Sequence, residues 1–206
     1  MQLQKQFKKI YFAFTAVILF SSTPLFNLKA QTVKLFADQA HSNVGFSVSL
    51  AGGLTRITGK YTDFDIILNY TDSDMTKSSI EANIKAASIN TGIAGRDQHL
   101  ATPDFFDATQ FPSITFTSDS IVKNGNGFIA FGSFQMHGIS KKIQLPFTVA
   151  GKDAKEGAIG FTARYTVKRS DYLIGKDTLK PTGDSFLSND VMVELDFIAK
   201  LKKPGK

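Results

Sequence analysis

The 206-residue chain has no cysteine, no tryptophan and only three histidines. Without cysteine, neither disulfides nor a lipid anchor on a bacterial N-terminal cysteine can be present. The histidines, His41, His99 and His137, lack the close spacing typical of a zinc site, so we expect neither a metal nor a cofactor. The sequence also lacks a Gly-x-Ser-x-Gly elbow, a phosphate-binding glycine loop and a paired-carboxylate signature. We therefore assign no catalytic residue and expect a protein that is not an enzyme.

Residues 1–30 have the pattern of a secretory signal peptide. Three lysines within residues 5–9 precede an apolar run over 10–20, and a polar stretch ends at Ala30. A helix of that run would be about 16 Å long, too short for a bilayer core of roughly 30 Å. We expect cleavage after Ala30, a periplasmic or secreted protein with no stable membrane anchor, and one domain over 31–206.

The chain has a formal net charge of +6, but this value overstates the charge of the exported domain. Four lysines and no acidic residue lie within residues 1–30, so their removal leaves about +2. A domain with so small a charge has no obvious polyanion-binding surface, and we expect no nucleic acid partner.

Alternation of apolar and polar residues predicts about eight or nine half-buried strands, because successive side chains of a strand face opposite ways. The alternating runs are 44–50, 64–70, 80–86, 114–116, 128–136, 143–149, 159–167 and 191–197. Asn124-Gly125-Asn126-Gly127 predicts a tight hairpin, and Gly151 to Gly157 predicts another turn. An antiparallel all-β domain follows, which can form either a sandwich or a closed barrel.

Residues 87–116 form a long interruption that is rich in glycine, aspartate and phenylalanine. We expect a short helix at about 94–100 and a turn at 103–107, with Thr102-Pro103-Asp104 resembling a helix N-cap followed by proline. Connections this long in small β-proteins are usually lids, plugs or functional loops.

Small residues on the apolar faces favour a cavity inside the domain. They are Ala82, Ala86, Ala130, Gly132 and Ala163. Placed opposite many phenylalanine rings, they could leave space in the interior. The alternative is that they only make room for those rings.

Several blocks in order resemble the YceI-like family of exported bacterial proteins, over about residues 38–199. The blocks are Asp38-Gln-Ala-His41-Ser42, Gly59-Lys-Tyr-Thr-Asp-Phe64, Ser88-Ile-Asn-Thr-Gly92, Arg96-Asp97-Gln-His99-Leu100, Asp104-Phe-Phe-Asp107, Phe111-Pro-Ser-Ile-Thr-Phe116, His137-Gly-Ile-Ser140-Lys141 and Arg169-Ser-Asp-Tyr-Leu-Ile-Gly175. The resemblance implies a single up-and-down, lipocalin-like β-barrel. It also implies an apolar lumen that holds a long-chain amphiphile, typically a polyisoprenoid or a fatty-acid derivative.

The ligand-binding hypothesis assigns inward-facing side chains to the lumen wall. These are Phe46, Phe64, Ile84, Phe116, Phe134, Phe147, Phe161 and Phe197. The alternative is that these side chains pack against one another and leave no tunnel.

Two further candidates, Arg96 and His99, belong to the most polar cluster of the long segment. Arg96 could hold an anionic head group at the mouth of the barrel, because its planar guanidinium can donate two hydrogen bonds to phosphate oxygens. In the structural alternative, Asp97 caps or salt-bridges locally and His99 is buried against a backbone carbonyl.

We therefore expect a non-enzymatic protein that sequesters or transports a lipid. One alternative is an enzyme that acts on such a lipid with His99 and Asp97 as acid and base. Another is a protein-interaction module with an unoccupied barrel. The sequence leaves open whether two subunits form a homodimer.

Overall fold

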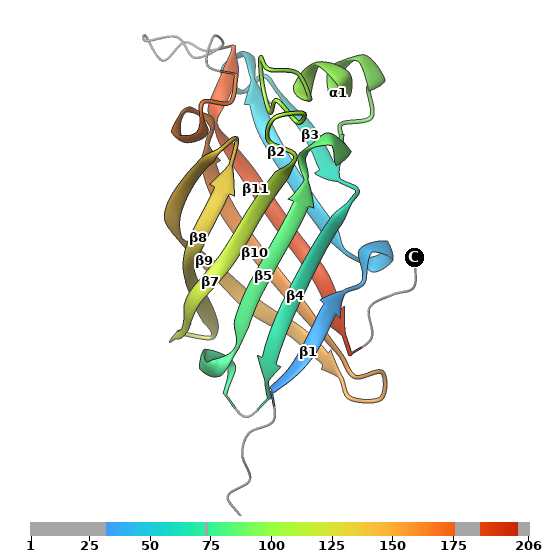
Figure 1. Ribbon diagram of the computed structural model, residues 1–206, viewed down its shortest axis with the longest axis vertical. Coiled ribbons are helices and arrows are strands. Elements are labelled where there is room, and N and C mark those ends of the chain that lie inside the picture. The colour runs from blue at the N-terminus through green and yellow to red at the C-terminus, as the bar shows by residue number, and fades with distance from the viewer. Residues whose placement is uncertain (1–31, 73, 176–185, 202–206) are drawn as a thin grey trace, which may run out of the picture.

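The computed structural model describes residues 32–72, 74–175 and 186–201 (Figure 1). Within these ranges the chain forms one eleven-stranded sheet. The strands are β1 (Thr32–Ala37), β2 (Asn43–Leu50), β3 (Thr55–Tyr61), β4 (Phe64–Thr71), β5 (Ser79–Lys85), β6 (Ile89–Asn90), β7 (Ser113–Asn124), β8 (Gly127–Met136), β9 (Ile139–Asp153), β10 (Ala158–Lys168) and β11 (Leu187–Lys200). The helix α1 spans Ala94–Leu100, and the short 3-10 turns are η1 (Gln39–His41), η2 (Ala51–Gly53), η3 (Met75–Lys77), η4 (Ala86–Ser88) and η5 (Arg169–Tyr172). The residues predicted to form the signal peptide lie outside the described ranges.

The eleven segments act as eight long strands, because three long strands are interrupted. β1 and β2 lie one after the other along the same edge of β11, with a break at residues 38–42. In the same way, β3 leads into β4 and β5 leads into β6, so β3 pairs with both β2 and β6 while β4 pairs with both β1 and β5. Neighbouring long strands are antiparallel and follow one another in sequence, which is an up-and-down meander.

The sheet closes on itself through β11. Ala37 of β1 lies opposite Ala199, and Val44 of β2 lies opposite Leu195, so the first long strand pairs with the last. Closure removes the free sheet edges and encloses an interior. The prediction of an all-β, antiparallel up-and-down barrel of about eight strands is confirmed, and the sandwich alternative is wrong.

The predicted hairpin and turn are both present. β7 ends at Asn124 opposite Gly127, so Gly125 and Asn126 form a two-residue turn, and Gly125 has a φ of +56°. A positive φ at this position is what the favoured two-residue hairpin turns require. The turn predicted at 151–157 lies between the end of β9 at Asp153 and the start of β10 at Ala158.

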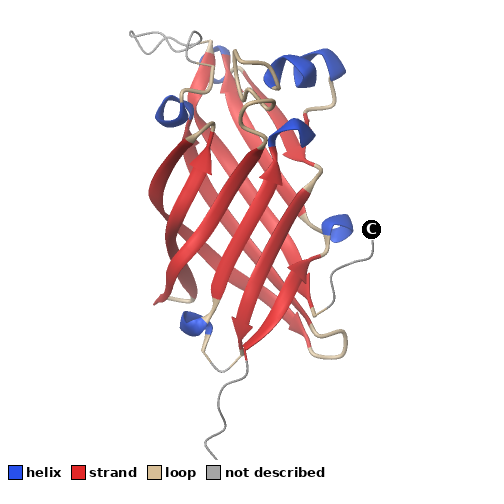
Figure 2. Ribbon diagram, viewed as in Figure 1, coloured by secondary structure: helices blue, strands red, loops and turns tan. Residues whose placement is uncertain are grey.

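The long segment at 87–116 contains one strand that was not predicted, because Ile89–Asn90 form β6. α1 occupies the predicted residues 94–100, and Ile114 and Phe116 belong to β7, as their alternation predicted. Thr102 does not cap a following helix, since its Oγ1 donates to the carbonyl of His99 at 2.7 Å and so helps to end α1. The connection without sheet pairing is therefore limited to residues 91–112, and Figure 2 shows its helix at one end of the barrel.

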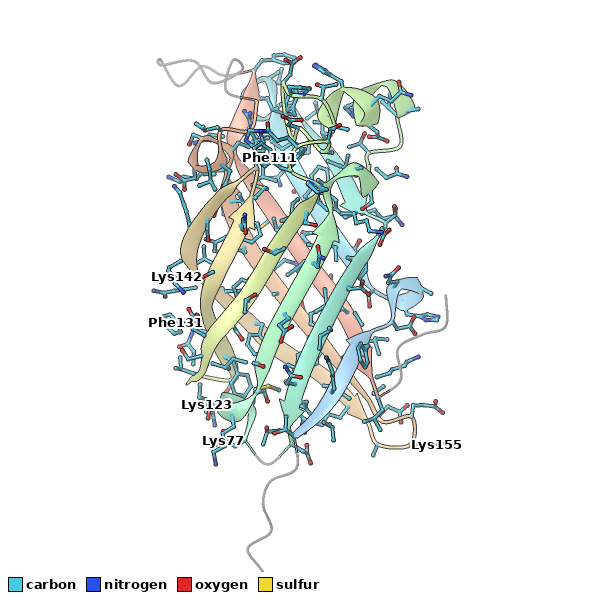
Figure 3. All side chains as sticks on the ribbon, viewed as in Figure 1. Lys77, Phe111, Lys123, Phe131, Lys142 and Lys155 are labelled. Atoms are coloured by element: carbon cyan, nitrogen blue, oxygen red, sulfur yellow. The ribbon has the colours of Figure 1, made fainter. Side chains whose placement is uncertain are left out.

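The inward faces of the strands form two apolar clusters. The larger fills the end of the barrel near β1, with Leu35, Leu68 and Ile121 among its most buried members. The smaller lies toward the α1 end, where Phe105, Tyr172 and Ile174 join strand residues. Outward-facing side chains such as Lys123 and Lys142 project from the barrel wall in Figure 3.

Candidate binding site

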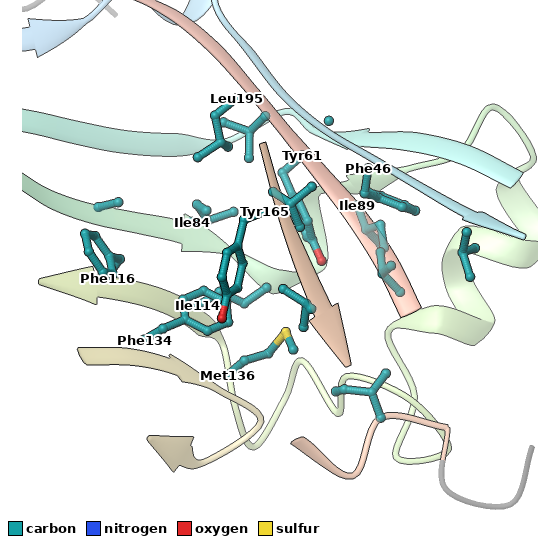
Figure 4. Close-up of a pocket in the computed structure, with 18 of the residues that line it drawn as sticks. Phe46, Tyr61, Ile84, Ile89, Ile114, Phe116, Phe134, Met136, Tyr165 and Leu195 are labelled. Carbon is teal, nitrogen blue, oxygen red and sulfur yellow. The ribbon is translucent and has the colours of Figure 1, made fainter. Parts of the chain in front are cut away.

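A cavity of about 630 Å³ lies in the barrel between the larger apolar cluster and the connection over residues 91–112, which contains α1. This connection is called the α1 segment below. Phe147 and Phe161 lie in its lower wall, and Leu100, Phe105 and Phe106 of the α1 segment line its upper part. Figure 4 shows lining residues contributed by several strands around the space. The volume falls within the range of roughly 300–1,000 Å³ that is usual for small-molecule pockets. The barrel interior is therefore hollow rather than filled with side chains.

Nine of the ten predicted site residues line this cavity. They are Phe46, Ile84, Arg96, His99, Phe116, Phe134, Phe147, Phe161 and Phe197. Their contact with a ligand stays a prediction. Phe64 is different, because it is only 3% exposed and packs within the larger apolar cluster without lining the cavity.

Other lining residues were missed by the sequence analysis. Tyr61 and Ile57 belong to β3, a strand that was not predicted. Tyr165 and Val193 lie on the inward faces of predicted strands. The alternation of Ile57, Gly59 and Tyr61 with charged or hydroxyl residues was the available signal. It was weak because glycine interrupts the apolar positions.

Two glycines let phenylalanine rings lie flat against the inner wall. A Cβ on Gly59 would lie 2.5 Å from Cζ of Phe46, the residue opposite it in β2. A Cβ on Gly132 would lie 2.8 Å from the ring of Phe116. Ala82 and Ala163, in contrast, line the cavity directly. Both explanations offered for the small residues therefore hold, each at different positions.

Thr91 anchors the two charged residues at the start of α1. Its backbone N–H donates to Asp97 Oδ1 at 2.9 Å, while Arg96 Nε donates to Thr91 Oγ1 at 2.7 Å and Arg96 Nη2 donates to the Thr91 carbonyl at 2.9 Å. The structural interpretation of Asp97 as a local cap describes this arrangement. Arg96 is half-buried, and it lines the cavity while it holds the helix.

His99 faces the surface at the mouth of the cavity. Its side chain is 59% exposed, its Nε2 lies 3.1 Å from Asp104 Oδ2, and its ring meets Phe105 edge-on at 5.1 Å. The expectation of a buried histidine bonded to a backbone carbonyl is therefore wrong. Asp97 bonds to Thr91 instead, so His99 and Asp97 are each engaged with a different partner.

Arg169 is a buried cation beside the upper part of the cavity. It is 5% exposed, and its guanidinium donates to the carbonyls of Ser188 at 2.8 Å, Leu187 at 2.9 Å and Ile174 at 3.0 Å. Burial lowers the pKa of Arg169 from its ordinary value. These bonds tie the turn after β10 to the start of β11, so the residue fixes the shape of the mouth.

The three histidines lie in different places. His41 Nδ1 lies 2.9 Å from Asp38, His99 contacts Asp104, and His137 Nδ1 lies 2.9 Å from the carbonyl of Tyr172. In the described ranges, His, Asp and Glu side chains form no group of three that could hold a metal ion. No helix within the part of the chain that the structure describes is long and apolar enough to span a membrane.

The architecture and the cavity together define the class of the protein: a closed, eight-stranded up-and-down barrel with a largely apolar binding pocket in its lumen. The chain belongs to the YceI-like domain family, whose family model matches residues 36–199. Protein YceI of Shigella flexneri is 28% identical over 151 residues, which cover 72% of this chain and 78% of that protein. The resemblance found in the sequence is confirmed.

Solved structures show the same fold. BcnA of Burkholderia cenocepacia superposes with a TM-score of 0.71 at 23% identity, over 80% of this chain and 99% of BcnA. A polyisoprenoid binding domain from Saccharophagus degradans, implicated in plant cell wall breakdown, superposes with a TM-score of 0.62 at 17% identity, over 82% of this chain and 99% of that domain.

Proposed function

We propose that this protein binds a long-chain amphiphilic lipid in the barrel lumen, and sequesters or transports it without changing it chemically. The observation that carries this proposal is the cavity of about 630 Å³, whose wall consists mainly of apolar side chains. The similar domain from Saccharophagus degradans is a polyisoprenoid binding domain, which favours a polyisoprenoid as the ligand. A fatty-acid derivative is the other ligand that the apolar wall of the cavity would accept.

Apolar burial can provide the affinity. Each methylene moved from water into such a lumen contributes about 0.8 kcal/mol, so a chain of about twelve carbons gains roughly 10 kcal/mol before the costs of association. The lower lumen supplies the necessary surface through side chains such as Leu68, Phe147 and Phe161. A site of this kind selects a ligand by length and shape.

The geometry favours binding over acid–base catalysis. A catalytic pair would need His99 and Asp97 to act together on one substrate atom. Asp97 accepts the Thr91 N–H, whereas His99 contacts Asp104 at the exposed mouth. Both side chains therefore have structural partners that account for their positions.

The first experiment identifies what the purified protein contains. Native mass spectrometry and solvent extraction of freshly purified protein should reveal a bound long-chain lipid. An Ala82→Phe variant, which adds a ring to the cavity wall, should retain much less lipid. Ala150→Phe is the matched control, because Ala150 is exposed on β9. Protein without lipid that also fails to take up added lipid would contradict the proposal and favour an interaction module.

We further propose that the protein is exported, to the periplasm or beyond the cell, because residues 1–30 have the pattern of a signal peptide. N-terminal sequencing of the protein from a cell-fractionation experiment tests this, with Gln31 expected as the first residue. Light scattering of the purified protein decides between a monomer and the homodimer that the sequence leaves open.

A further inference from the structure

Among the residues that line the cavity, only five carry polar side chains, and two of these are tyrosines. Arg96, His99 and Arg169 lie at the mouth, and each has a protein partner. Tyr61 and Tyr165 extend from β3 and β10 into the lumen, and Figure 4 shows both rings among the apolar lining residues.

The hydroxyls of these two tyrosines form no hydrogen bond with the part of the chain that the structure describes. In the same ranges, no fully buried side-chain nitrogen or oxygen lacks a partner. The two hydroxyls are therefore not sealed inside protein, and they face open space in the cavity. Polar groups in protein interiors are nearly always satisfied, so two unpaired hydroxyls in one apolar lumen require an explanation.

The two tyrosines enter the same section of the barrel. Across the sheet, Tyr61 of β3 pairs with Val44 of β2, and Val44 pairs with Leu195 of β11. Leu195 pairs with Ala163 of β10. Tyr165 is the next residue of β10 on that face. The Tyr61 ring packs 6.0 Å from Phe46 and 6.3 Å from Phe106, directly beneath the α1 segment.

Both phenols keep their proton at neutral pH. Burial raises the pKa of Tyr61 above its ordinary value, and burial together with the charge of Asp171 raises the pKa of Tyr165. Each hydroxyl can therefore donate one hydrogen bond and accept another. An uncharged oxygen suits such a pair, whereas a carboxylate or phosphate would lose its hydration without gaining a cation at this level of the lumen.

We propose that the Tyr61 and Tyr165 hydroxyls are the recognition point of the lumen and hold an uncharged oxygen group of the lipid, a hydroxyl or a carbonyl, beneath the α1 segment. This inference rests on the proposed lipid-binding function. The hydrocarbon chain then occupies the lower lumen, whose wall includes Phe147 and Phe161. Head-group selection thus takes place inside the barrel, on these two phenols, and not on Arg96 at the rim.

Three saturated ligands with one carbon skeleton test this assignment: phytane, dihydrophytol (called phytol below) and phytanic acid, which differ in having no oxygen, a hydroxyl or a carboxylate. Their affinities are measured by displacement of N-phenyl-1-naphthylamine from the protein after it has been stripped of co-purified lipid. A net hydrogen bond corresponds to a factor of about 2–10 in affinity. We expect the wild type to prefer phytol to phytane by about tenfold, and a Tyr61→Phe/Tyr165→Phe double variant to lose that preference while binding phytane as before.

Tyr70→Phe is the matched control, because Tyr70 is buried on β4, donates to Asp72 at 2.6 Å and does not line the cavity. This variant should keep the preference for phytol. The lipid-free double variant should melt at the wild-type temperature, since it loses no hydrogen bond of the protein. A large drop in melting temperature would instead assign the hydroxyls a structural role and overturn the inference.

Two further outcomes overturn it. One is equal binding of phytol and phytane by the wild type. The other is a preference for phytanic acid that survives loss of both hydroxyls and disappears in Arg96→Gln. In either case, displacement of the probe by phytane still supports the proposed function. Failure of all three ligands to displace the probe, or of the probe to bind, would contradict both the inference and the proposed function.

Discussion

Lys200 Nζ donates to Asp38 Oδ2 at 2.8 Å, and so joins the break after β1 to the last residue of β11. His41 Nδ1 lies 2.9 Å from the same oxygen, and Asp38 Oδ1 accepts the Ala40 N–H at 3.2 Å. Although Asp38 is only 5% exposed, its carboxylate is fully engaged. One side chain thus serves both as the cap of η1 and as a connection between the two strands that close the barrel.

This contact predicts a specific dependence on pH. The hydrogen bond from Lys200, followed by that with His41, lowers the pKa of Asp38 from 3.8 to about 2. Because the folded-state pKa lies below the ordinary value, ionised Asp38 stabilises the fold above about pH 4. This stabilisation is lost as the pH falls through 4 toward 2. Asp38→Asn should lower the free energy of unfolding at pH 7 by about 1–3 kcal/mol and flatten its decline between pH 4 and 2, as measured by urea unfolding.

Asp119→Asn serves as the control for that experiment. Asp119 pairs with Lys142 on the exposed outer wall, where an ion pair contributes little. If the free energy of unfolding of Asp38→Asn declined between pH 4 and 2 as steeply as that of the wild type, another carboxylate would be responsible for the loss of stability in acid.

Substitution of Gly59 tests how the lumen is shaped. Gly59→Ala places a Cβ 2.5 Å from the Phe46 ring and 2.9 Å from the Asn90 carbonyl, so the ring and the strand must both shift. We expect a loss of about 1–3 kcal/mol in the free energy of unfolding, which is typical of overpacking, together with weaker lipid retention. Gly95→Ala in α1 is the control, since nothing lies within 4 Å of its added carbon, and it should be neutral or stabilising. Equal stability of the two variants would contradict this account.

Thr91 is expected to control the order of the α1 segment. Thr91→Val removes the hydroxyl that accepts from Arg96 Nε and donates to Asp97 Oδ1. Hydrogen exchange followed by mass spectrometry should then show exchange in residues 91–100 that is at least about five- to tenfold faster, since about 1 kcal/mol is lost for each of the two bonds, with the barrel strands unchanged. Gln98→Ala, at an exposed position of the same helix, should leave the exchange rates nearly as they were. Uniform acceleration in strands and helix would mean that Thr91 supports the whole barrel.

Arg169 predicts a large effect for a conservative change. The three carbonyls of Leu187, Ser188 and Ile174 accept from three different nitrogens of the guanidinium. The single ammonium group of a lysine cannot reach all three, so buried acceptors would lose their donors. Arg169→Lys should therefore cost about 2–4 kcal/mol in chemical denaturation. Arg164→Lys, at a half-exposed position paired with Asp196, should cost less than about 1 kcal/mol. Similar losses in the two variants would disprove the role assigned to Arg169.

The local features of the sequence predicted most of the fold. Alternation identified the strands from β7 to β11, the repeated Asn-Gly pair identified the β7–β8 hairpin, and residues 94–100 were predicted as a helix. Alternation also identified β2, β4 and β5, although each of them is only part of a long strand. β1 and β3 were missed because their alternation is weaker, since apolar Phe36 breaks it in β1 and Gly59 interrupts it in β3.

The candidate site was harder to predict, because its details depend on contacts between distant residues. Phe46 and Phe64 look alike in the sequence, yet one lines the cavity and the other packs in the core. Gly132 and Ala82 are both small, but only Ala82 faces the open space. The tyrosines were passed over in favour of phenylalanines, and Asp104 was not expected to contact His99, because these positions are set by the tertiary fold.

The pairing of β11 also determines when the molecule can become a barrel. β11 pairs with β10 along one edge, and with both β2 and β1 along the other edge. A chain that emerges N-terminus first has seven long strands with two bare edges until residues 187–200 arrive. Closure of the barrel therefore has to wait for residues 187–200, and a stop codon before Leu187 would yield an open, aggregation-prone sheet instead of a weakened barrel.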